Sequence, residues 1–255
     1  MTRPVFLSDG LSADPAGLEA GARARLGGDE GRHAAQVRRI GAGEWVDVVD
    51  GRGRRLVCEV VGASKTGLDL VVASAADEAG PAVRTVLVQA LAKGGHDEQA
   101  VGAVVPWASE RAVVRWSGPR ALKGRAKWQG VARAAAKQAR RAFVPEVGEP
   151  LDTRGLLGWV GRLVEAGGAA LVCHEEASAG IGSVLDGLRA DSPGGRLPGR
   201  VAVVVGPEGG ISPGESEALA GAGAVLVGVG PTVLRSSTAG AVALALVLAA
   251  AGQYR

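Results

Sequence analysis

Apolar, β-branched residues dominate three short segments near the start of the chain. These β-branched segments are WVDVV (45–49), RLVCEVV (55–61) and LDLVVA (68–73). The intervening DGRG (50–53) is typical of a hairpin turn, whereas residues 31–40 have helical periodicity and are followed by a glycine. The pattern predicts a small β-barrel with one helix over residues 1–76.

The pattern changes near Val83, where apolar runs begin to alternate with alanine-rich helical segments. The runs expected to form strands are VRTVLVQAL (83–91), AVVPW (103–107), AALVCHE (169–175), VAVVVG (201–206) and AVLVGVG (224–230). Such alternation is typical of an α/β domain with a mainly parallel sheet. We therefore expect a second domain over residues 80–255, after a linker at DEAGP (77–81).

Three of the expected strands end in unusual loops. These are CHEE (173–176), GPEGG (206–210) and GVGPTVLRSSTAG (228–240). Ligands bind beyond the carboxyl ends of the strands in open sheets of this kind, so three such loops at one edge predict a single pocket. The glycines let main chain approach a ligand, and LRSSTA (234–239) gathers an arginine and three hydroxyls before an apolar helix.

Two phosphate-binding motifs do not fit these loops. No lysine follows the glycines of GPEGG, as a P-loop requires. GVGP (228–231) supplies only the first two glycines of a dinucleotide fingerprint, and too little chain follows for that fold. Ser212 and Pro213 instead supply an N-cap and a proline at the first turn of a helix after GPEGG.

Charge is distributed unevenly, although the net charge is only +3. Ten lysines and arginines and no acidic residue lie between Arg111 and Pro145. Within this block Arg133, Lys137 and Arg140/Arg141 share one helical face. A block of one sign predicts an anion-binding face rather than an ordinary solvated helix.

Other residue types narrow the class of protein. The two cysteines and three histidines are scattered, which predicts a reducing cytoplasmic setting and no metal site. No cleavable signal sequence is expected at MTRP, and the longest apolar run (239–252) is shorter than the about 20 residues that span a bilayer.

With these motifs in order, the chain resembles the SPOUT-class methyltransferases that modify uridine N3 in small-subunit (16S) ribosomal RNA. The resemblance is carried by GDEGRHAAQVRRIGAGE (28–44), ALAKG (90–94), SERAVVRW (109–116), KQARRAFVPEV (137–147), LVCHEE (171–176), VVVGPEGGISPGE (203–215) and GPTVLRSSTA (230–239). It implies an N-terminal PUA-like barrel for RNA, a C-terminal domain with a trefoil knot, and a homodimer. It also implies S-adenosylmethionine as the cofactor and the small ribosomal subunit as the partner.

The chain departs from this family at two places. Ser237 stands where many members carry a glutamate, so no essential carboxylate is expected there. The family also has a longer helical segment before the SER motif, whereas residues 93–101 run almost directly into the next strand.

The resemblance assigns roles to residues of this chain. It implies cofactor contacts by residues of the three loops, namely His174, Gly206, Pro207, Glu208, Gly209, Gly210, Val227, Gly228, Gly230, Pro231, Leu234, Ser236, Thr238 and Ala239. Arg235 is the candidate to stabilise a uracil anion, and Glu208 is a candidate proton acceptor. The candidates for RNA binding are Arg38, Arg39, Arg133, Lys137, Arg140 and Arg141.

Three alternatives remain at this level: a knotted methyltransferase for another RNA position, a non-catalytic RNA-binding assembly factor, and a nucleotide-binding regulator. Nucleoside analysis of the product separates the first alternative, and S-adenosylmethionine binding separates an enzyme from an assembly factor. A regulator would show salt-sensitive anion binding without an RNA product.

Overall fold

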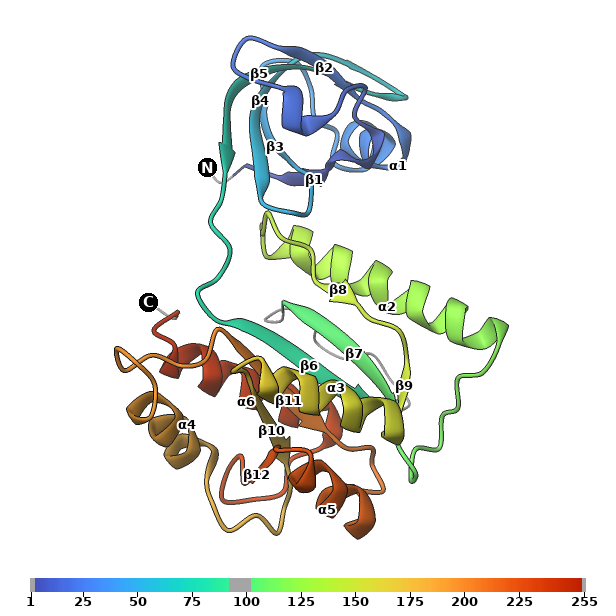
Figure 1. The fold of residues 1–255 in the computed structure, drawn as a ribbon. Helices are drawn as coiled ribbons and strands as arrows, with labels where there is room; N and C mark the ends of the chain where they lie inside the picture. Colours follow the sequence, from blue (N-terminus) through green and yellow to red (C-terminus); the bar gives the residue numbers. More distant parts are fainter. Residues whose placement is uncertain (1–2, 92–101, 254–255) are drawn as a thin grey trace. The chain divides into compact units, whose positions relative to one another are not determined.

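The structure is a computed structural model that describes residues 3–91 and 102–253. The segment 93–101 singled out above lies outside the described residues. The chain divides into two compact units, one formed by residues 1–80 and 133–144 and the other by residues 81–132 and 145–255 (Figure 1).

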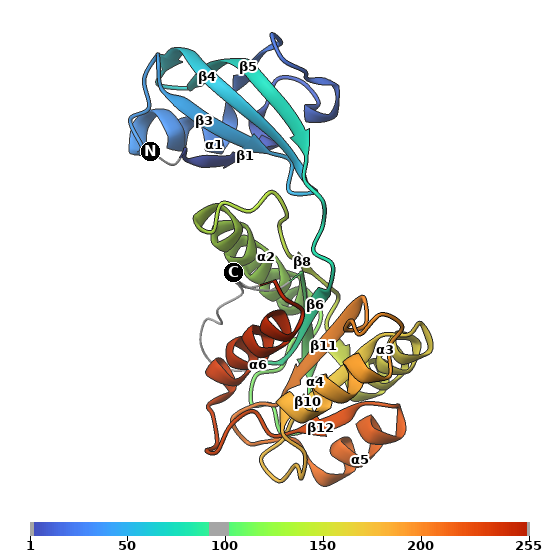
Figure 2. The same ribbon diagram turned by 90° about the vertical axis from the view of Figure 1, so that its left-hand side faces the viewer.

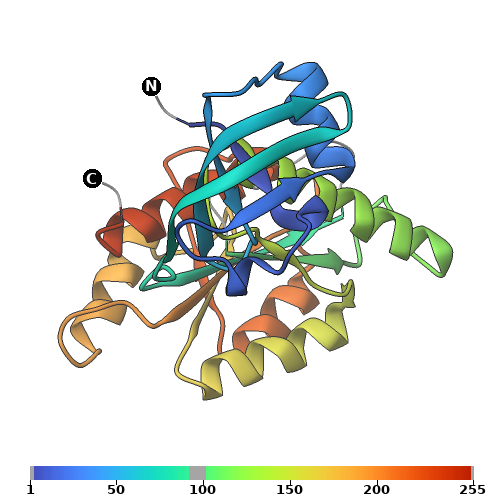
Figure 3. The ribbon, with the colours of Figure 1, turned by 90° about the horizontal axis from the view of Figure 1, so that it is seen from above.

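The first unit is built on a mixed five-stranded sheet. Its strands are β1 (Val5–Leu7), β2 (Arg23–Leu26), β3 (Trp45–Val49), β4 (Arg54–Ser64) and β5 (Gly67–Asp77), in the order β1-β3-β4-β5-β2. The β3–β4 pair is antiparallel, as the predicted hairpin turn at DGRG requires, and the β4–β5 pair is also antiparallel, whereas β1 pairs with β3 in parallel. Two irregularities in the β4–β5 register bend these long strands, which Figure 3 shows as a twisted pair.

Apolar side chains from this sheet enclose one core. Phe6, Leu26, Val48, Leu56 and Leu70 are all at most 2 % exposed in it. The helical segment begins earlier than the predicted residue 31. It comprises α1 (Gly28–Arg32) and a single π-helical turn, η3 (His33–Val37), while short 3-10 turns η1 (Ser8–Gly10) and η2 (Pro15–Gly17) complete the unit.

The second unit contains a parallel sheet. Its strands are β6 (Arg84–Ala90), β7 (Ala103–Ala108), β8 (Glu146–Val147), β9 (Leu151–Asp152), β10 (Ala169–Cys173), β11 (Arg200–Val205) and β12 (Val225–Val227). The order is β12-β10-β11-β6-β7-β8, with β9 also paired to β7, and every pair recorded among these strands is parallel. The predicted strand runs and the mainly parallel sheet are confirmed.

Helices cover both faces of this sheet. They are α2 (Pro119–Gln138, whose last turn belongs to the first unit), α3 (Thr153–Glu165), α4 (Ile181–Ala190), α5 (Pro213–Gly221) and α6 (Ser236–Ala250). Alternate residues of β11 separate the two layers: Val203 packs with α4 and α6, and Val204 packs with α3 and α5. Figure 2 shows α6 on one side of the sheet and α3 and α5 on the other.

Candidate functional site

The three unusual loops leave neighbouring strands at the same edge of the parallel sheet. β10 lies between β11 and β12, with Val172 level with Val204 on one side and with Leu226 on the other. Because parallel strands share a direction, the segments that follow Cys173, Val205 and Val227 all begin at the carboxyl edge. The sequence pattern predicted this arrangement.

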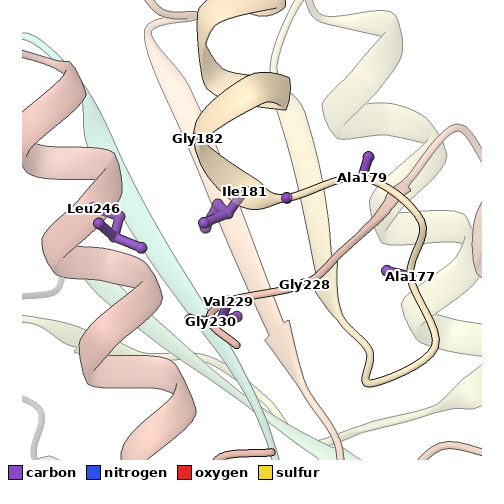
Figure 4. Close-up of a pocket in the computed structure, with 9 residues that line it drawn as sticks. Ala177, Ala179, Ile181, Gly182, Gly228, Val229, Gly230 and Leu246 are labelled. Carbon is purple, nitrogen blue, oxygen red and sulfur yellow. The ribbon is translucent and has the colours of Figure 1, made fainter. Parts of the chain in front are cut away.

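The first and third loops are hydrogen-bonded to each other. Gly228 donates its N–H to the Ala179 carbonyl at 2.9 Å and accepts from the Ile181 N–H at 2.8 Å. The chain after β12 thus runs directly against the segment that leads into α4 (Figure 4). Beside this crossing lies an open pocket of about 430 Å³.

The pocket has an almost wholly apolar and main-chain lining. It is formed by residues 177 and 179–182, residues 228–230, and Leu246 of α6. Only Gly228 and Gly230 of the predicted cofactor residues line it, and the GPEGG loop does not. The pocket therefore lies between the third loop and the segment that follows CHEE, and neither CHEE nor GPEGG lines it.

GPEGG forms a tight turn whose exposed tip is main chain. Gly210 donates its N–H to the Pro207 carbonyl at 2.9 Å and has a φ of +71°, a conformation that favours glycine. Gly206 has a local reason of its own, because a Cβ there would lie 2.6 Å from Cγ1 of Ile211. Glu208, Gly209 and Gly210 are exposed, whereas Pro207 is buried.

Glu215, in the first turn of α5, connects this loop to two other elements. The residue is 5 % exposed. Its Oε1 atom accepts from the Glu110 N–H at 2.8 Å and from the Thr153 hydroxyl at 2.7 Å. The other carboxylate oxygen accepts from the N–H of Ser212, which completes a capping box. A buried carboxylate with this many donors fixes the start of α5 in place.

The SER motif contacts the GPEGG loop directly. Arg111 donates from Nη1 to the Gly209 carbonyl at 3.2 Å, and a Cβ added to Gly209 would lie 3.4 Å from the Cβ of Arg111. The sequence pattern includes this motif but assigns no role to Arg111. Its proximity to GPEGG depends on the fold, since the two residues are 98 positions apart.

His174 and Cys173 begin the first loop. The ring Nδ1 of His174 accepts from the Glu176 N–H at 3.2 Å, which leaves the proton of a neutral ring on Nε2. His174 is half-buried and can donate from that nitrogen. Burial raises the pKa of the Cys173 thiol to about 12, so this thiol stays neutral and is a poor nucleophile.

Arg235 is the N-cap residue of α6, and its side chain is exposed. Its carbonyl accepts from the N–H groups of Thr238 and Ala239, which starts the helix. No carboxylate of the described residues pairs with its guanidinium. A helix N-terminus and a cation thus both present positive charge at this point.

Several main-chain donors in the loops have no partner among residues 3–91 and 102–253. They are the N–H groups of Glu208, Gly209, Gly230 and Leu234. A nucleoside with an amino-acid tail carries ribose, purine and carboxylate acceptors that such donors satisfy. The donor set therefore fits S-adenosylmethionine, with Glu208 as a nearby exposed carboxylate for a sulfonium cation.

The predicted RNA-binding residues fall within the first unit and divide into two groups. Arg133 is paired with Asp9, and the Lys137 ammonium lies 2.7 Å from the Glu30 carboxylate. Burial lowers the pKa of the Arg141 guanidinium. The side chains of Arg38, Arg39 and Arg140 are exposed.

The described residues carry neither a metal site nor a membrane span. None of their histidine, cysteine and acidic side chains form a group that could hold a metal ion. Within the same part of the chain, no helix is long and apolar enough to cross a membrane.

Comparisons with known proteins agree with this geometry. Residues 82–248 match a family described as RNA methyltransferase domain, and residues 26–73 match RNA methyltransferase PUA domain. A ribosomal RNA small subunit methyltransferase E of Mycobacterium bovis is 44% identical over 239 residues, covering 90% of this chain and 87% of the relative. The Bacillus subtilis protein of that name is 26% identical over 229 residues, covering 86% and 87%.

A solved structure shares the fold. The ribosomal RNA small subunit methyltransferase E of Neisseria gonorrhoeae, bound to S-adenosyl methionine, superposes with a TM-score of 0.79 at 21% identity and covers 97% of this chain and 98% of its own. The fold and the sequence match together define an RNA methyltransferase with an N-terminal PUA-like domain and a C-terminal domain of the SPOUT fold. Within that class, the chain belongs to the ribosomal RNA small subunit methyltransferase E family.

Proposed function

We propose that this protein transfers a methyl group from S-adenosylmethionine to N3 of a uridine in 16S ribosomal RNA. The observation that carries the proposal is the placement of the three loops at one edge of the sheet, with unpaired main-chain donors in the second and third of them. The gonorrhoeal relative of the same fold is solved with S-adenosyl methionine bound.

Residues of all three loops would hold the cofactor. We assign this role to His174 in the first loop and to Gly206 to Gly210 in the second. In the third loop and the start of α6 we assign it to Val227, Gly228, Gly230, Pro231, Leu234, Ser236, Thr238 and Ala239. Gly228 and Gly230 line the pocket beside Ile181. Gly206 acts indirectly, because it lets Ile211 pack beneath the turn that presents Glu208 and Gly209.

The cofactor supplies an electrophilic methyl group when it is bound. Uracil N3 carries a proton and becomes a competent nucleophile only as that proton leaves. Glu208 is exposed at the loop tip and is the candidate to accept the proton. Arg235, at the positive end of α6, would stabilise the negative charge that develops on the uracil oxygens.

The target base must leave its stack to reach these loops, which costs a few kcal/mol. Contacts to the RNA backbone offset that cost. In the first unit, Arg38, Arg39 and Arg140 are exposed and suited to phosphate contacts. Arg133 and Lys137 would contribute in a second way, because their ion pairs with Asp9 and Glu30 hold the end of α2 against η1 and α1. Arg141 is proposed as a further phosphate contact.

We further propose that the protein acts as a homodimer in the cytoplasm, where ribosomal RNA is assembled into subunits. Exposed apolar side chains such as Val233 (73% exposed) and Leu246 (38% exposed) lie in or next to the third loop and α6. A second copy covering this region would bury them.

Nucleoside analysis tests the reaction. The purified protein is incubated with S-adenosylmethionine and small ribosomal subunits from cells that lack it, and the digested RNA is analysed by mass spectrometry. We expect 3-methyluridine at one position. Methylation of a ribose hydroxyl or another base, or no product with correctly folded protein, would contradict the proposal.

A further inference from the structure

Six of the ten cations of the basic block lie in the second unit, and only Arg125 among them forms an ion pair with a described residue. We propose that a strip of five exposed cations there binds the RNA strand that carries the target base. The basic strip consists of Arg111, Arg115, Arg120, Lys123 and Lys127. This inference rests on the proposed function, since it names the surface that brings RNA to the same site.

Ion pairing differs between the part of the block in the first unit and the part in the second. In the first unit, Arg133 and Lys137 are paired with Asp9 and Glu30. In the basic strip, by contrast, none of the five cations makes an ion pair with any described residue. Unpaired cations without an intervening acidic residue attract a polyanion.

Aromatic packing fixes the start of the strip against α2. The Trp116 and Trp128 rings meet edge to face with centroids 5.2 Å apart. A Cβ on Gly124 would lie 2.4 Å from the Trp116 ring, so the glycine lets this indole rest on the helix. The segment that carries Arg111 and Arg115 is therefore held beside the helical part of the strip.

The same segment also reaches the cofactor loop. Arg111 donates to the Gly209 carbonyl at 3.2 Å, and Glu215 accepts from the neighbouring Glu110 N–H. One end of the strip is thus attached to GPEGG. A strand bound along it would arrive at the loop that presents Glu208.

The helical part of the strip has the spacing of a single face. Arg120, Lys123 and Lys127 stand at i, i+3 and i+7, which aligns them over about 10 Å of helix. Arg125, which lies between them in sequence, points elsewhere and pairs with Glu149 at 2.6 Å. Phosphates of a single strand are the acceptors that such a row fits.

The test measures the salt dependence of RNA binding. Affinity for a labelled oligouridylate is followed against salt for the wild-type protein and for R120Q/K123Q/K127Q. Five contacts give a slope of log affinity on log salt of roughly −3.5, and two give roughly −1.4. We expect the slope to change from roughly −3.5 in the wild type to roughly −1.4 in the triple variant. The KM of the triple variant for ribosomal RNA should be roughly tenfold to a hundredfold higher at low salt.

A matched control has the same loss of charge at the opposite edge of the sheet. R84Q/R196Q/R200Q removes three exposed cations, two of which begin β6 and β11. The salt slope of this control should equal that of the wild type. The single strip variant K127Q should have a slope that is less steep by roughly 0.7. Thermal unfolding midpoints verify that all variants are folded.

The outcomes distinguish this inference from the proposed function. A lower slope only in the strip variants, with S-adenosylmethionine affinity and kcat at saturating RNA retained, supports the inference. An unchanged slope in both strip variants, or an equal change in the control, overturns it even if methylation proceeds normally. Failure of the wild-type protein to methylate uridine would instead refute the proposed function. The salt slopes would still test whether the basic strip binds RNA.

Discussion

Single residues in the loops have two kinds of task, and the sequence alone did not separate them. The sequence of GPEGG suggested glycines that contact a ligand. Glycine is needed at 206, however, because a Cβ there would lie 2.6 Å from the Ile211 side chain, and at 210 because φ is +71°. The N–H groups of Gly209 and Gly230 have no partner among the described residues and can face a ligand. Packing against a residue five positions later cannot be seen in a motif, because it depends on how the turn folds.

Arg235 gives the sharpest prediction at the scale of one residue. Arg235→Ala should lower kcat roughly 10²- to 10³-fold, the loss seen when one donor to a developing anion is removed. Affinity for S-adenosylmethionine should stay near the wild-type value, because the guanidinium is assigned to the base. Steady-state kinetics and titration calorimetry measure the two quantities.

Arg196→Ala is the matched control, since Arg196 is also exposed in the second unit and precedes β11 at the other edge of the sheet. It should turn over normally. Normal turnover by Arg235→Ala would remove its catalytic role.

Secondary-structure elements were predicted well where periodicity was strong. The runs at 45–49, 103–107 and 201–206 became β3, β7 and β11 within a residue at each end. The connections between elements were not predictable in the same way. Glu215 is bonded to Glu110, 105 positions away, and to Thr153, 62 positions away, so only the fold brings these residues together.

Glu215→Gln tests whether this carboxylate positions the GPEGG loop. The amide replaces one acceptor by a donor that faces existing N–H groups, which should destabilise the protein by about 1–3 kcal/mol. Because the loop and Arg111 are then less firmly held, S-adenosylmethionine affinity should also fall. Chemical denaturation and calorimetry give both values.

Glu217→Gln, on the same helix but exposed, provides the comparison and should leave stability and affinity unchanged. If Glu215→Gln lost stability but bound the cofactor with wild-type affinity, the residue would be structural only. The positioning role would then be withdrawn.

At the scale of the whole molecule, composition and pattern predicted two domains and a parallel sheet, and only the family resemblance predicted a knot. Periodicity cannot predict a knot, because a knot depends on how segments far apart in the sequence pass one another. The charge of residues 111–145 was visible in the sequence. Which cations are neutralised was not, since Asp9 and Glu30 lie more than one hundred residues from their partners Arg133 and Lys137.

The central claim is that the three loops together bind S-adenosylmethionine. Hydrogen–deuterium exchange of the protein with and without saturating S-adenosylmethionine tests it most directly. The account predicts slower exchange in peptides that cover residues 174–181, 206–212 and 228–239, and little change in the barrel. Protection confined to other segments, or absent from all three loops at a concentration that saturates binding, would contradict it.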